Sequence, residues 1–561
     1  MNFETEADRI IAEALDLNLP KSFFLFAGAG AGKTRSLVNA LQYIKNEFGK
    51  MLQIRNKKVG VITYTNVAVK EISERIEHDS LFTISTIHSF AWNLIKGFDV
   101  DIKRCLYDIL QQKIIKKEKD YLKILERLAA LRDVKHFIYD PASGAVNSGI
   151  DSLSHSEVIQ ICSKLLLEKP LMANILVQRF PILFIDEAQD TDRELMDALL
   201  FVQKNNKEVF SLGLFGDTKQ RIYSSGKENM GTINWKSYGF EVPEKLENHR
   251  SGSRIVDLAN KIGRLIDNNP EQEKVESKGT GIVRLFVVPT DVDKKLVELK
   301  IKKRMAEITN DPLWNKDSWS GQEGAVLVLE HRMAAVRLGF VEMFDALRKS
   351  KEFDNVKAGT SSEINFFADF ILPIVMAESP FEITNITRKY NKKLFVNITQ
   401  NLLLKIKNSI DKIRNAYFDN PNITFGQMLQ VIKQGGVFDV PRKFEENYEE
   451  FKPFLDTKFS QIRNYFNYIH ELSDFRTHHG VKGQEFDNVM VVIDNDSRWN
   501  AYNQKGFFFN ENVNSGTLRL LYVVCTRARK NLAIVLYTDK IRDELNGGWF
   551  DKEEIIDDIY K

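Results

Sequence analysis

Residues 27–34 bring glycines, a lysine and a threonine together in an order that suits phosphate binding. They read AGAGAGKT and directly follow the apolar run of residues 22–26. Glycines allow the backbone to fold closely around an oligophosphate with its N–H groups pointing inward. These glycines are Gly28, Gly30 and Gly32. Lys33 adds a positive charge for the β- and γ-phosphates, and Thr34 offers a hydroxyl to Mg²⁺. We therefore predict a site for ATP and Mg²⁺ here.

A less specific interpretation of the same stretch is a glycine- and alanine-rich turn before a core helix. A strict phosphate-loop pattern has glycine at the position of Ala27. A turn, however, needs neither Lys33 nor the threonine behind it, and burying a lysine without an anion is costly. From Arg35 onward, apolar residues recur at helical spacing, which would place the anion at a helix N-terminus. The phosphate-loop interpretation is therefore favoured.

Two consecutive carboxylates follow a second apolar run. Residues 181–185 read PILFI, and Asp186 and Glu187 come next, within the sequence DEAQD. In metal-assisted phosphoryl transfer, one carboxylate holds Mg²⁺ and another polarises the attacking water. An acidic surface loop would not need a buried strand before it. The pair therefore predicts the metal-binding and catalytic carboxylates of an ATPase.

Polar residues also follow the other runs that read as strands, where the carboxyl ends of a parallel sheet would meet. They are Tyr64, Asn66, His88 and Gln220, with Arg250 further along the chain. A glutamine at a strand end can sense a γ-phosphate or orient water, and an arginine can serve as an arginine finger. Taken singly, His88 reads more simply as a core histidine and Arg250 as a surface residue. Their weight therefore depends on the whole set.

The composition is that of a large multidomain chain without a global signal for nucleic acid. The 561 residues are 43% hydrophobic, which is ample for several cores. Lys and Arg (79) nearly balance Asp and Glu (77), so any nucleic-acid binding must come from local grooves. The sequence contains neither a long apolar run nor a signal peptide, which predicts a cytoplasmic protein without a membrane partner. Cys105, Cys162 and Cys525 are too far apart to suggest a zinc cluster or disulfides.

Eight motifs occur in the order that is typical of one known family. The first six read AGAGAGKT, TYTN, STIHSF, DEAQD, GDTKQRIY and LENHRS. Residues 477–486, THHGVKGQEF, resemble the family pattern T-x-H-x-x-K-G-x-E-F, and residues 521–528, LYVVCTRA, resemble L-Y-V-x-x-T-R-A. Together they resemble the motifs of the UvrD/Rep/PcrA family of superfamily 1 DNA helicases. The motifs cover the first core domain and the C-terminal hundred residues, and the two stretches between are assigned by exclusion.

The resemblance implies an α/β fold with two RecA-like P-loop domains, each interrupted by a mainly helical insertion, and an ATP cleft between them. We predict the first domain at 1–96 and 178–266, with its insertion at 97–177. The second domain is predicted at 267–345 and 471–561, with a reduced insertion at 346–470. Its start is a breaker-rich linker, which suggests a hinge. Its predicted buried strands are residues 324–330, 488–493 and 532–537.

The resemblance also implies roles for the residues that match the motifs. The nucleotide-binding set is Gly28, Gly30, Gly32, Lys33, Thr34, Arg35, His249 and Glu485. The catalytic set is Lys33, Asp186, Glu187, Gln220, Arg250 and Arg527, of which Asp186, with Thr34, holds the metal. In this set Gln220 senses the γ-phosphate, and the two arginines are fingers from opposite sides of the cleft. The set that lines single-stranded DNA is Tyr64, Asn66, His88, Thr477 and His479, with Tyr64 as a base-stacking aromatic.

Three positions depart from the family pattern. The N-terminal glutamine that reads adenine has no counterpart in residues 3–11, which contain no glutamine. The tyrosine that stacks on adenine is replaced by His249, although Arg35 keeps the other side of the base. A DNA-binding tryptophan of the family falls at Ser225, and Trp235 is a candidate substitute. The selectivity for the base is therefore expected to be loose.

The favoured function is an ATP-dependent DNA translocase and helicase with 3′→5′ polarity, acting on single-stranded or tailed duplex DNA. One alternative is a DNA-sensing ATPase subunit that regulates a partner nuclease in a bacterial anti-phage defence complex, the defence-associated, Gabija-type branch. The reduced second insertion and the expected absence of a C-terminal tail domain favour this alternative slightly. The other alternative, a nuclease in its own right, is disfavoured because no second carboxylate and lysine cluster stands out.

Overall fold

The computed structural model describes residues 5–116, 121–139, 150–223, 225–390, 399–494, 504–509, 511–540, 544–545 and 548–560. The chain forms two compact units. Unit 1 comprises Met1–Val283, Ser497–Leu532 and Asp543–Asp551. Unit 2 comprises Arg284–Asp496, Ala533–Arg542 and Lys552–Lys561. The chain therefore crosses between the units more than once, and each unit is described by itself.

Unit 1 is built on a parallel sheet with the strand order β3-β2-β4-β5-β1-β6, and β7 also pairs with β1. Its strands are β1 Ser22–Ala27, β2 Val59–Thr63, β3 Phe82–Thr86, β4 Ile182–Ile185, β5 Ser211–Gly216, β6 Phe240–Glu241 and β7 Glu244–Lys245. The short strands β8 Glu247–Asn248 and β9 Glu273–Lys274 pair separately. The central strands β1, β2, β4 and β5 are buried along their whole length, as expected for a parallel sheet with both faces covered.

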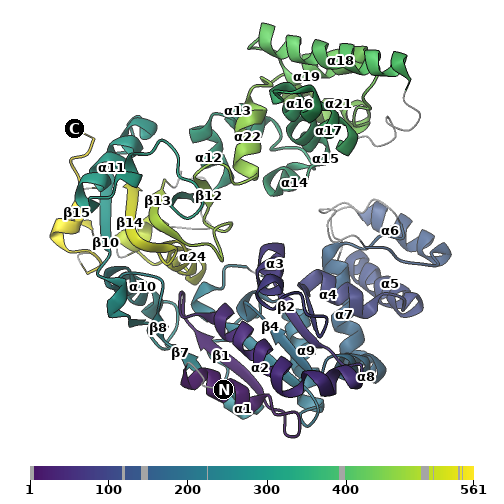
Figure 1. Ribbon diagram of the computed structural model, residues 1–561, viewed down its shortest axis with the longest axis vertical. Helices are drawn as coiled ribbons and strands as arrows, with labels where there is room; N and C mark the ends of the chain where they lie inside the picture. Colours follow the sequence, from purple (N-terminus) through teal and green to yellow (C-terminus); the bar gives the residue numbers. More distant parts are fainter. Residues whose placement is uncertain are drawn as a thin grey trace. The chain divides into compact units, whose positions relative to one another are not determined.

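Helices cover this sheet, and Figure 1 shows several of them beside its strands. The helices of unit 1 are α1 Glu6–Ala14, α2 Lys33–Ile54, α3 Asn66–Arg75, α4 Ile87–Ile95, α5 Asp99–Ile115, α6 Tyr121–Ala130, α7 His155–Glu168, α8 Pro170–Arg179, α9 Arg193–Asn205, α10 Ser253–Arg264, α23 Gln504–Phe508 and α24 Ser515–Cys525. The side chains of β1 alternate between two cores. Phe23 and Leu25 pack into one of them, and Phe24 and Phe26 pack into the other. This alternation fixes the strand whose end carries the glycine loop.

Unit 2 contains a second sheet, with the order β12-β11-β13-β14-β10-β15. Its strands are β10 Ile282–Val288, β11 Gly324–Val328, β12 Phe475–Thr477, β13 Phe486–Ile493, β14 Ala528–Tyr537 and β15 Ile555–Ile556. Its helices are α11 Lys294–Thr309, α12 His331–Leu338, α13 Val341–Ala346, α14 Phe353–Ala358, α15 Ser362–Asn365, α16 Leu372–Met376, α17 Pro380–Tyr390, α18 Gln400–Asp419, α19 Phe425–Gly435, α20 Lys443–Glu446, α21 Tyr448–Leu455 and α22 Gln461–Ile469. A π-helical turn, Phe366–Ile371, joins α15 to α16.

The α/β fold class is confirmed, because both units contain parallel strands with helices around them. The described parts of 97–177 and 346–470 are mainly helical, and strands occur in each of the three segments predicted to be buried strands of the second domain. The proposed four-part division of the chain stays a prediction. The segment Ser497–Leu532 belongs to unit 1. Its helix α24 packs against α10 and the 3₁₀ turn Thr218–Gln220 of unit 1.

Candidate active site

The glycine loop lies between β1 and α2, and its glycines have separate structural reasons. Gly30 and Gly32 have φ values of 76° and 83°, a left-handed region that other residues rarely adopt. A Cβ atom at Gly28 would lie 2.5 Å from Nε2 of Gln272. The Lys33 ammonium donates to the carbonyl of Ala27 at 3.4 Å, so alanine at that position keeps the contact. The loop is therefore shaped to bring backbone N–H groups close to an anion at the start of α2.

Three buried side chains form hydrogen bonds that support this loop. The carbonyl of Ala29 accepts hydrogen bonds from Nδ2 of Asn248 at 3.0 Å and from Nε2 of Gln272 at 3.1 Å. The Gln272 amide also donates to the hydroxyl of Tyr522 at 3.0 Å, on α24. All three side chains are inaccessible or nearly so. The family motifs contain Asn248 and Tyr522, but no role was predicted for them, and Gln272 lies in a stretch that reads only as a linker.

The two predicted catalytic carboxylates follow β4 directly. The backbone N–H of Asp186 continues the sheet by donating to the carbonyl of Ile62 at 2.8 Å. Glu187 has a φ of 51°, a left-handed value that costs energy for a non-glycine residue. Nε2 of Gln189 donates to Oε2 of Glu187 at 2.6 Å. The Glu187 side chain is therefore held by a neighbour from its own motif.

Gln189 also connects the ends of two strands. It is fully buried, and its Oε1 accepts the backbone N–H of Asp217 at 3.1 Å, just after β5. Asp217 in turn accepts from Nε2 of Gln220 at 2.7 Å. Burial raises the pKa of Asp217, and the charge of Lys33 opposes this rise. A single hydrogen-bonded network thus joins the carboxylate motif to the predicted γ-phosphate sensor.

Of the two predicted arginine fingers, Arg527 joins this network directly, and Arg250 contacts the residue next to it in the chain. Nη2 of Arg527 donates to Oε1 of Gln220 at 3.0 Å, and the Arg527 side chain is almost fully buried. Nη1 of Arg250 donates to the carbonyl of Thr526 at 3.1 Å. Both arginines therefore lie at the turn at the end of α24, and their action from opposite sides of a bound nucleotide stays a prediction. Helix α24 itself packs on α10 of unit 1.

The predicted nucleotide-base contacts are distributed more widely. Arg35 lies on the first turn of α2 with an exposed side chain. The backbone N–H of His249 donates to the carbonyl of Gly30 at 3.1 Å, and its exposed ring pairs with Glu247. Glu485 belongs to unit 2. The sandwich of the base between Arg35 and His249 stays a prediction.

The predicted DNA-contacting residues of unit 1 fall into two kinds. Tyr64 stacks on Tyr223 with ring centroids 4.6 Å apart, and 38% of its surface is exposed. Asn66 begins α3 and is exposed. His88 instead lies against His155, with ring centroids 4.7 Å apart, and burial lowers its pKa to about 4. Tyr64 therefore offers an accessible aromatic face, whereas His88 resembles a packed neutral histidine.

Two other sequence predictions can be placed. Trp235 is wrong as a substitute DNA platform, because it is buried and stacks on Phe24 at 4.9 Å inside the core. Ser225, where the family has its tryptophan, is exposed. In unit 2, Thr477 is buried and its hydroxyl accepts the backbone N–H of Gly480 at 3.0 Å. Burial lowers the pKa of His479, which is partly exposed.

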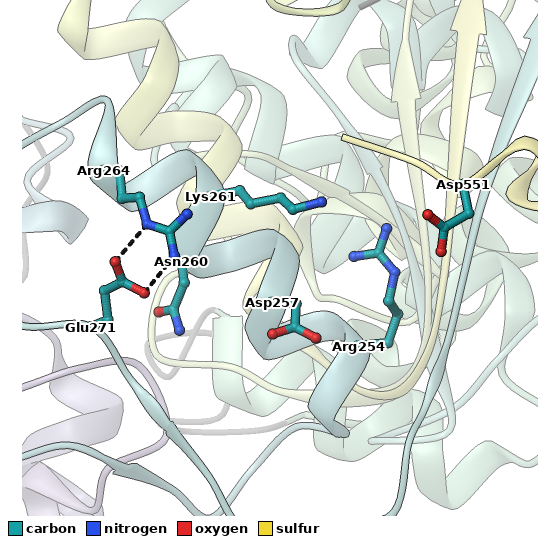
Figure 2. A pocket seen from close by; sticks show the side chains of 7 residues that line it. All are labelled: Arg254, Asp257, Asn260, Lys261, Arg264, Glu271 and Asp551. Atoms are coloured by element: carbon teal, nitrogen blue, oxygen red, sulfur yellow. Dashed lines mark hydrogen bonds and ion pairs between the residues drawn. The ribbon is translucent and has the colours of Figure 1, made fainter. Parts of the chain in front are cut away.

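A pocket of about 210 Å³ beside α10 lies apart from this network (Figure 2). It is lined by Arg254, Asp257, Asn260, Lys261, Arg264, Glu271 and Asp551. The guanidinium of Arg264 makes two hydrogen bonds to Glu271, at 2.5 and 2.8 Å. Lys261 and Arg254 each donate to a carbonyl of residues 548–549 at 2.9 Å. Because its cations contact protein acceptors, this pocket serves to attach the segment around Trp549 to α10.

Within the described ranges, no group of three or more His, Cys, Asp or Glu side chains is arranged to hold a metal by itself. The three cysteines are buried and unpaired. No helix among the described residues is both long and apolar enough to cross a membrane. An Mg²⁺ ion here would have to bind through Thr34, Asp186 and a nucleotide, a donor set of oxygens that Mg²⁺ accepts.

Comparisons with known proteins agree with this site. A family model described as an AAA domain matches residues 12–226, which include the glycine loop and the carboxylate pair. The chain is 25% identical to the Gabija protein GajB of Bacillus cereus over 660 aligned positions, covering 92% of this chain and 93% of GajB. It is 25% identical to the ATP-dependent DNA helicase Rep of Buchnera aphidicola over 52% of this chain and 49% of Rep. It is 24% identical to the ATP-dependent DNA helicase PcrA of Staphylococcus aureus over 44% of this chain and 38% of PcrA.

The two kinds of match differ in extent. The chain spans about half the length of Rep and less of PcrA, whereas its similarity to GajB runs along most of both chains. The comparisons confirm the predicted resemblance, the P-loop fold and the enzyme class of a helicase-type ATPase. The chain is therefore similar to the UvrD/Rep/PcrA helicases of superfamily 1 over part of its length, and to the Gabija protein GajB over most of it.

Proposed function

We propose that the chain is an ATP-driven DNA translocase and helicase that acts on single-stranded DNA with 3′→5′ polarity. The observation that carries this proposal is the buried hydrogen-bonded network of Glu187, Gln189, Asp217, Gln220 and Arg527. A base, a phosphate sensor and an arginine joined beside a phosphate loop are the parts that nucleotide hydrolysis needs. Polarity is taken from the family resemblance.

Each residue then has a defined task in hydrolysis. Lys33 and the loop N–H groups hold the phosphates, while Thr34 and Asp186 hold Mg²⁺, which neutralises charge on the phosphates when bound. Glu187 takes the proton of the attacking water. Gln220 reports the state of the γ-phosphate to Arg527 on α24, because the two side chains are hydrogen-bonded. Occupancy of the site is thereby linked to a helix outside the sheet.

Nucleic acid would contact the same sheet edge through Tyr64 and Tyr223. Tyr64 follows β2, whose end is bonded to Asp186, and Tyr223 follows Gln220 by three residues. The backbone N–H groups of Ile222 and Tyr223 donate to Oδ1 of Asp190, at 3.3 and 3.4 Å, within the carboxylate motif. A base stacked on this pair would therefore lie on elements that also carry catalytic residues.

The basic experiment measures ATP hydrolysis with and without single-stranded DNA, and then strand displacement on duplexes with a 3′ or a 5′ tail. We expect DNA to raise the ATPase rate and the 3′-tailed duplex to be unwound faster. An ATPase rate that is the same with and without single-stranded DNA would contradict the proposal. Faster unwinding of the 5′-tailed duplex would contradict only the polarity.

The role of Tyr64 is tested by Tyr64→Ala. Stacking of an aromatic on a base is worth roughly 1–3 kcal/mol, so the DNA concentration for half-maximal stimulation should rise about tenfold, with the basal rate unchanged. Tyr107→Ala, at an exposed tyrosine of α5, is the matched control. Equal loss of basal and stimulated rates would show that Tyr64 only supports the core.

A second candidate function is that of a DNA-sensing ATPase subunit that regulates a partner nuclease in anti-phage defence. The similarity to GajB along nearly the whole chain favours it. If the purified chain hydrolyses ATP on DNA but displaces no strand, and a nuclease encoded beside it restores a DNA-processing activity, this function replaces the first. A cytoplasmic location stays the expectation for either function.

A further inference from the structure

A second pocket of unit 1, of about 100 Å³, is lined by two arginines, each of which has a buried Nε donor without an acceptor. Arg221 comes from the loop after Gln220, and Arg519 comes from α24. Thr218, Lys227 and Asp267 also line the pocket. Nε of Arg221 and Nε of Arg519 are both buried without a hydrogen-bond partner. A guanidinium keeps its proton in a protein. Burying two such charges with unsatisfied donors is costly unless an acceptor or a negative charge binds beside them.

The hydrogen bonds that these arginines make within the pocket go to neutral carbonyl groups. Nη1 of Arg519 donates to the carbonyl of Thr218 at 3.0 Å, and Nη1 of Arg221 donates to the carbonyl of Gly226 at 3.0 Å. The nearest carboxylate of Arg221 is the exposed Glu228, at 3.8 Å. Burial, followed by the nearby charge of Arg221, lowers the pKa of Arg519, although the carboxylates of Asp267, Asp217 and Glu228 oppose this shift in part. Carbonyl groups satisfy donors but do not neutralise charge, so the repulsion remains.

The other charges around the pocket are already occupied. Lys227 is paired with Asp197 at 2.5 Å. Asp267 accepts the hydroxyl of Thr218 at 2.8 Å and lies 3.9 Å from the ammonium of the buried Lys219. Among the charged residues that line the pocket, Arg221 and Arg519 are therefore the cations available to bind an anion. In the pocket of Figure 2, by contrast, the guanidinium of Arg264 is paired with the carboxylate of Glu271.

We propose that the pocket between Arg221 and Arg519 binds a phosphate group. Planar guanidinium groups match the oxygens of a phosphate with two donors each, and such bonds are stronger than neutral ones. A pocket for a whole nucleotide or a drug-sized molecule is typically about 300–1,000 Å³, so this one suits a single oxyanion group. The site is separate from the glycine loop that holds the nucleotide in the proposed function.

The neighbours of the pocket suggest two sources for this phosphate. Gln189, which holds Glu187, also lines the pocket, and Tyr223 lies two residues after Arg221. A phosphodiester of a strand stacked on Tyr223 is one source. Inorganic phosphate released by hydrolysis is the other. Both share the chemistry of the site, and only the first depends on the proposed DNA binding.

The first experiment measures the affinity for oligo(dT) as a function of salt. For single strands, each neutralised phosphate contributes about −0.7 to the slope of log K against log salt. We expect Arg221→Gln and Arg519→Gln each to lower the magnitude of the slope by about 0.7, with the fold checked by circular dichroism. Arg264→Gln, which removes a paired arginine of the other pocket, is the control and should leave the slope unchanged.

The second experiment titrates the full chain with inorganic phosphate against chloride at equal ionic strength and follows the melting temperature. If the source is free phosphate, the wild type is stabilised by phosphate, the Arg221→Gln and Arg519→Gln variants are not, and the DNA slope is unaltered. If the wild type does not bind DNA at all, the proposed function fails while this arm still decides the site. Wild-type behaviour of both variants in both experiments would overturn the phosphate site. Arg519→Lys, which keeps the charge without the planar fork, replaces Arg519→Gln should that variant not fold.

Discussion

The predicted catalytic residues of unit 1 lie at one edge of its sheet, and hydrogen bonds hold this catalytic edge together. The helices within residues 346–470 of unit 2 are instead held together by contacts between aromatic rings. At the catalytic edge, the bonds made by Gln189 join residues from two strands. In unit 2, the ring of Phe367 is fully buried. It contacts the rings of Phe425, Phe444, Phe454 and Phe459 at centroid distances of 5.1 to 6.1 Å. In Figure 1 these helices form a group drawn in green.

The difference explains which region the sequence reveals. Hydrogen bonds need particular donors and acceptors at particular places, so a polar site appears as a motif with fixed residue types. An apolar core accepts many combinations of similar volume, so it leaves only a composition and a helical period. Substitutions should therefore act on chemistry in the first region and on stability in the second.

The largest expected effect on chemistry is that of Glu187→Gln. Removing a general base typically costs 10² to 10⁴ in rate, so we expect a fall of roughly that size in the DNA-stimulated ATPase rate. Binding of ATP and DNA should persist, because Asp186 and the loop remain. Steady-state kinetics together with nucleotide binding decide the point, with Glu194→Gln on α9 as the control. A rate near that of the wild type would remove Glu187 from the mechanism, and Lys33→Ala should weaken nucleotide binding as well.

A substitution among the aromatic rings around Phe367 should instead lower stability and leave catalysis intact. Phe367→Ala should lower the free energy of unfolding by about 3–5 kcal/mol, the usual cost of a lost buried aromatic ring. Because Phe367 lies in unit 2, the basal ATPase rate of the folded protein should stay close to that of the wild type. Denaturant unfolding measures the first quantity, and Phe381→Ala, at a residue of α17 that is 74% exposed, is the control. A large loss of basal ATPase activity under folding conditions would break the separation between the two regions.

The third prediction concerns Gln189, which the sequence did not single out. Hydrogen bonds to charged groups contribute about 1.5–3 kcal/mol, so Gln189→Ala should lower kcat about 10- to 100-fold with little change in the KM for ATP. If Gln189 acts by positioning Glu187, the same substitution should add little to Glu187→Gln, because the two residues act as a unit. Additive losses in the double variant would indicate a general structural role. Gln203→Ala, at a buried glutamine of α9, is the control.

Much of unit 1 could be predicted because its signals are local. The run of residues 22–26 became β1, and the glycines after it match the left-handed turns and close contacts of the loop. Gln272 could not be predicted, because its role depends on a contact with Ala29 that is distant in sequence. Trp235 was misjudged for a related reason. Its burial against Phe24 is a tertiary contact, and a tryptophan near a DNA-binding motif carries no sign of which way it faces.

The smallest expected effect is on the choice between ATP and GTP. At the predicted site for the base, we identify no side chain that would hydrogen-bond the adenine edge. Residues 3–11 contain no glutamine, and Asp8 of α1 is committed to Lys245 at 3.0 Å. The side chains of Arg35 and His249 are exposed and suited to stacking, which accepts any purine. Losing one hydrogen bond of about 1 kcal/mol changes a rate by less than tenfold. We therefore expect kcat/KM for GTP to lie within about tenfold of that for ATP. A preference for ATP of several hundredfold would mean that backbone groups or another residue near α1 hydrogen-bond the adenine. Recognition by hydrogen bonds would then include the base as well as the phosphates.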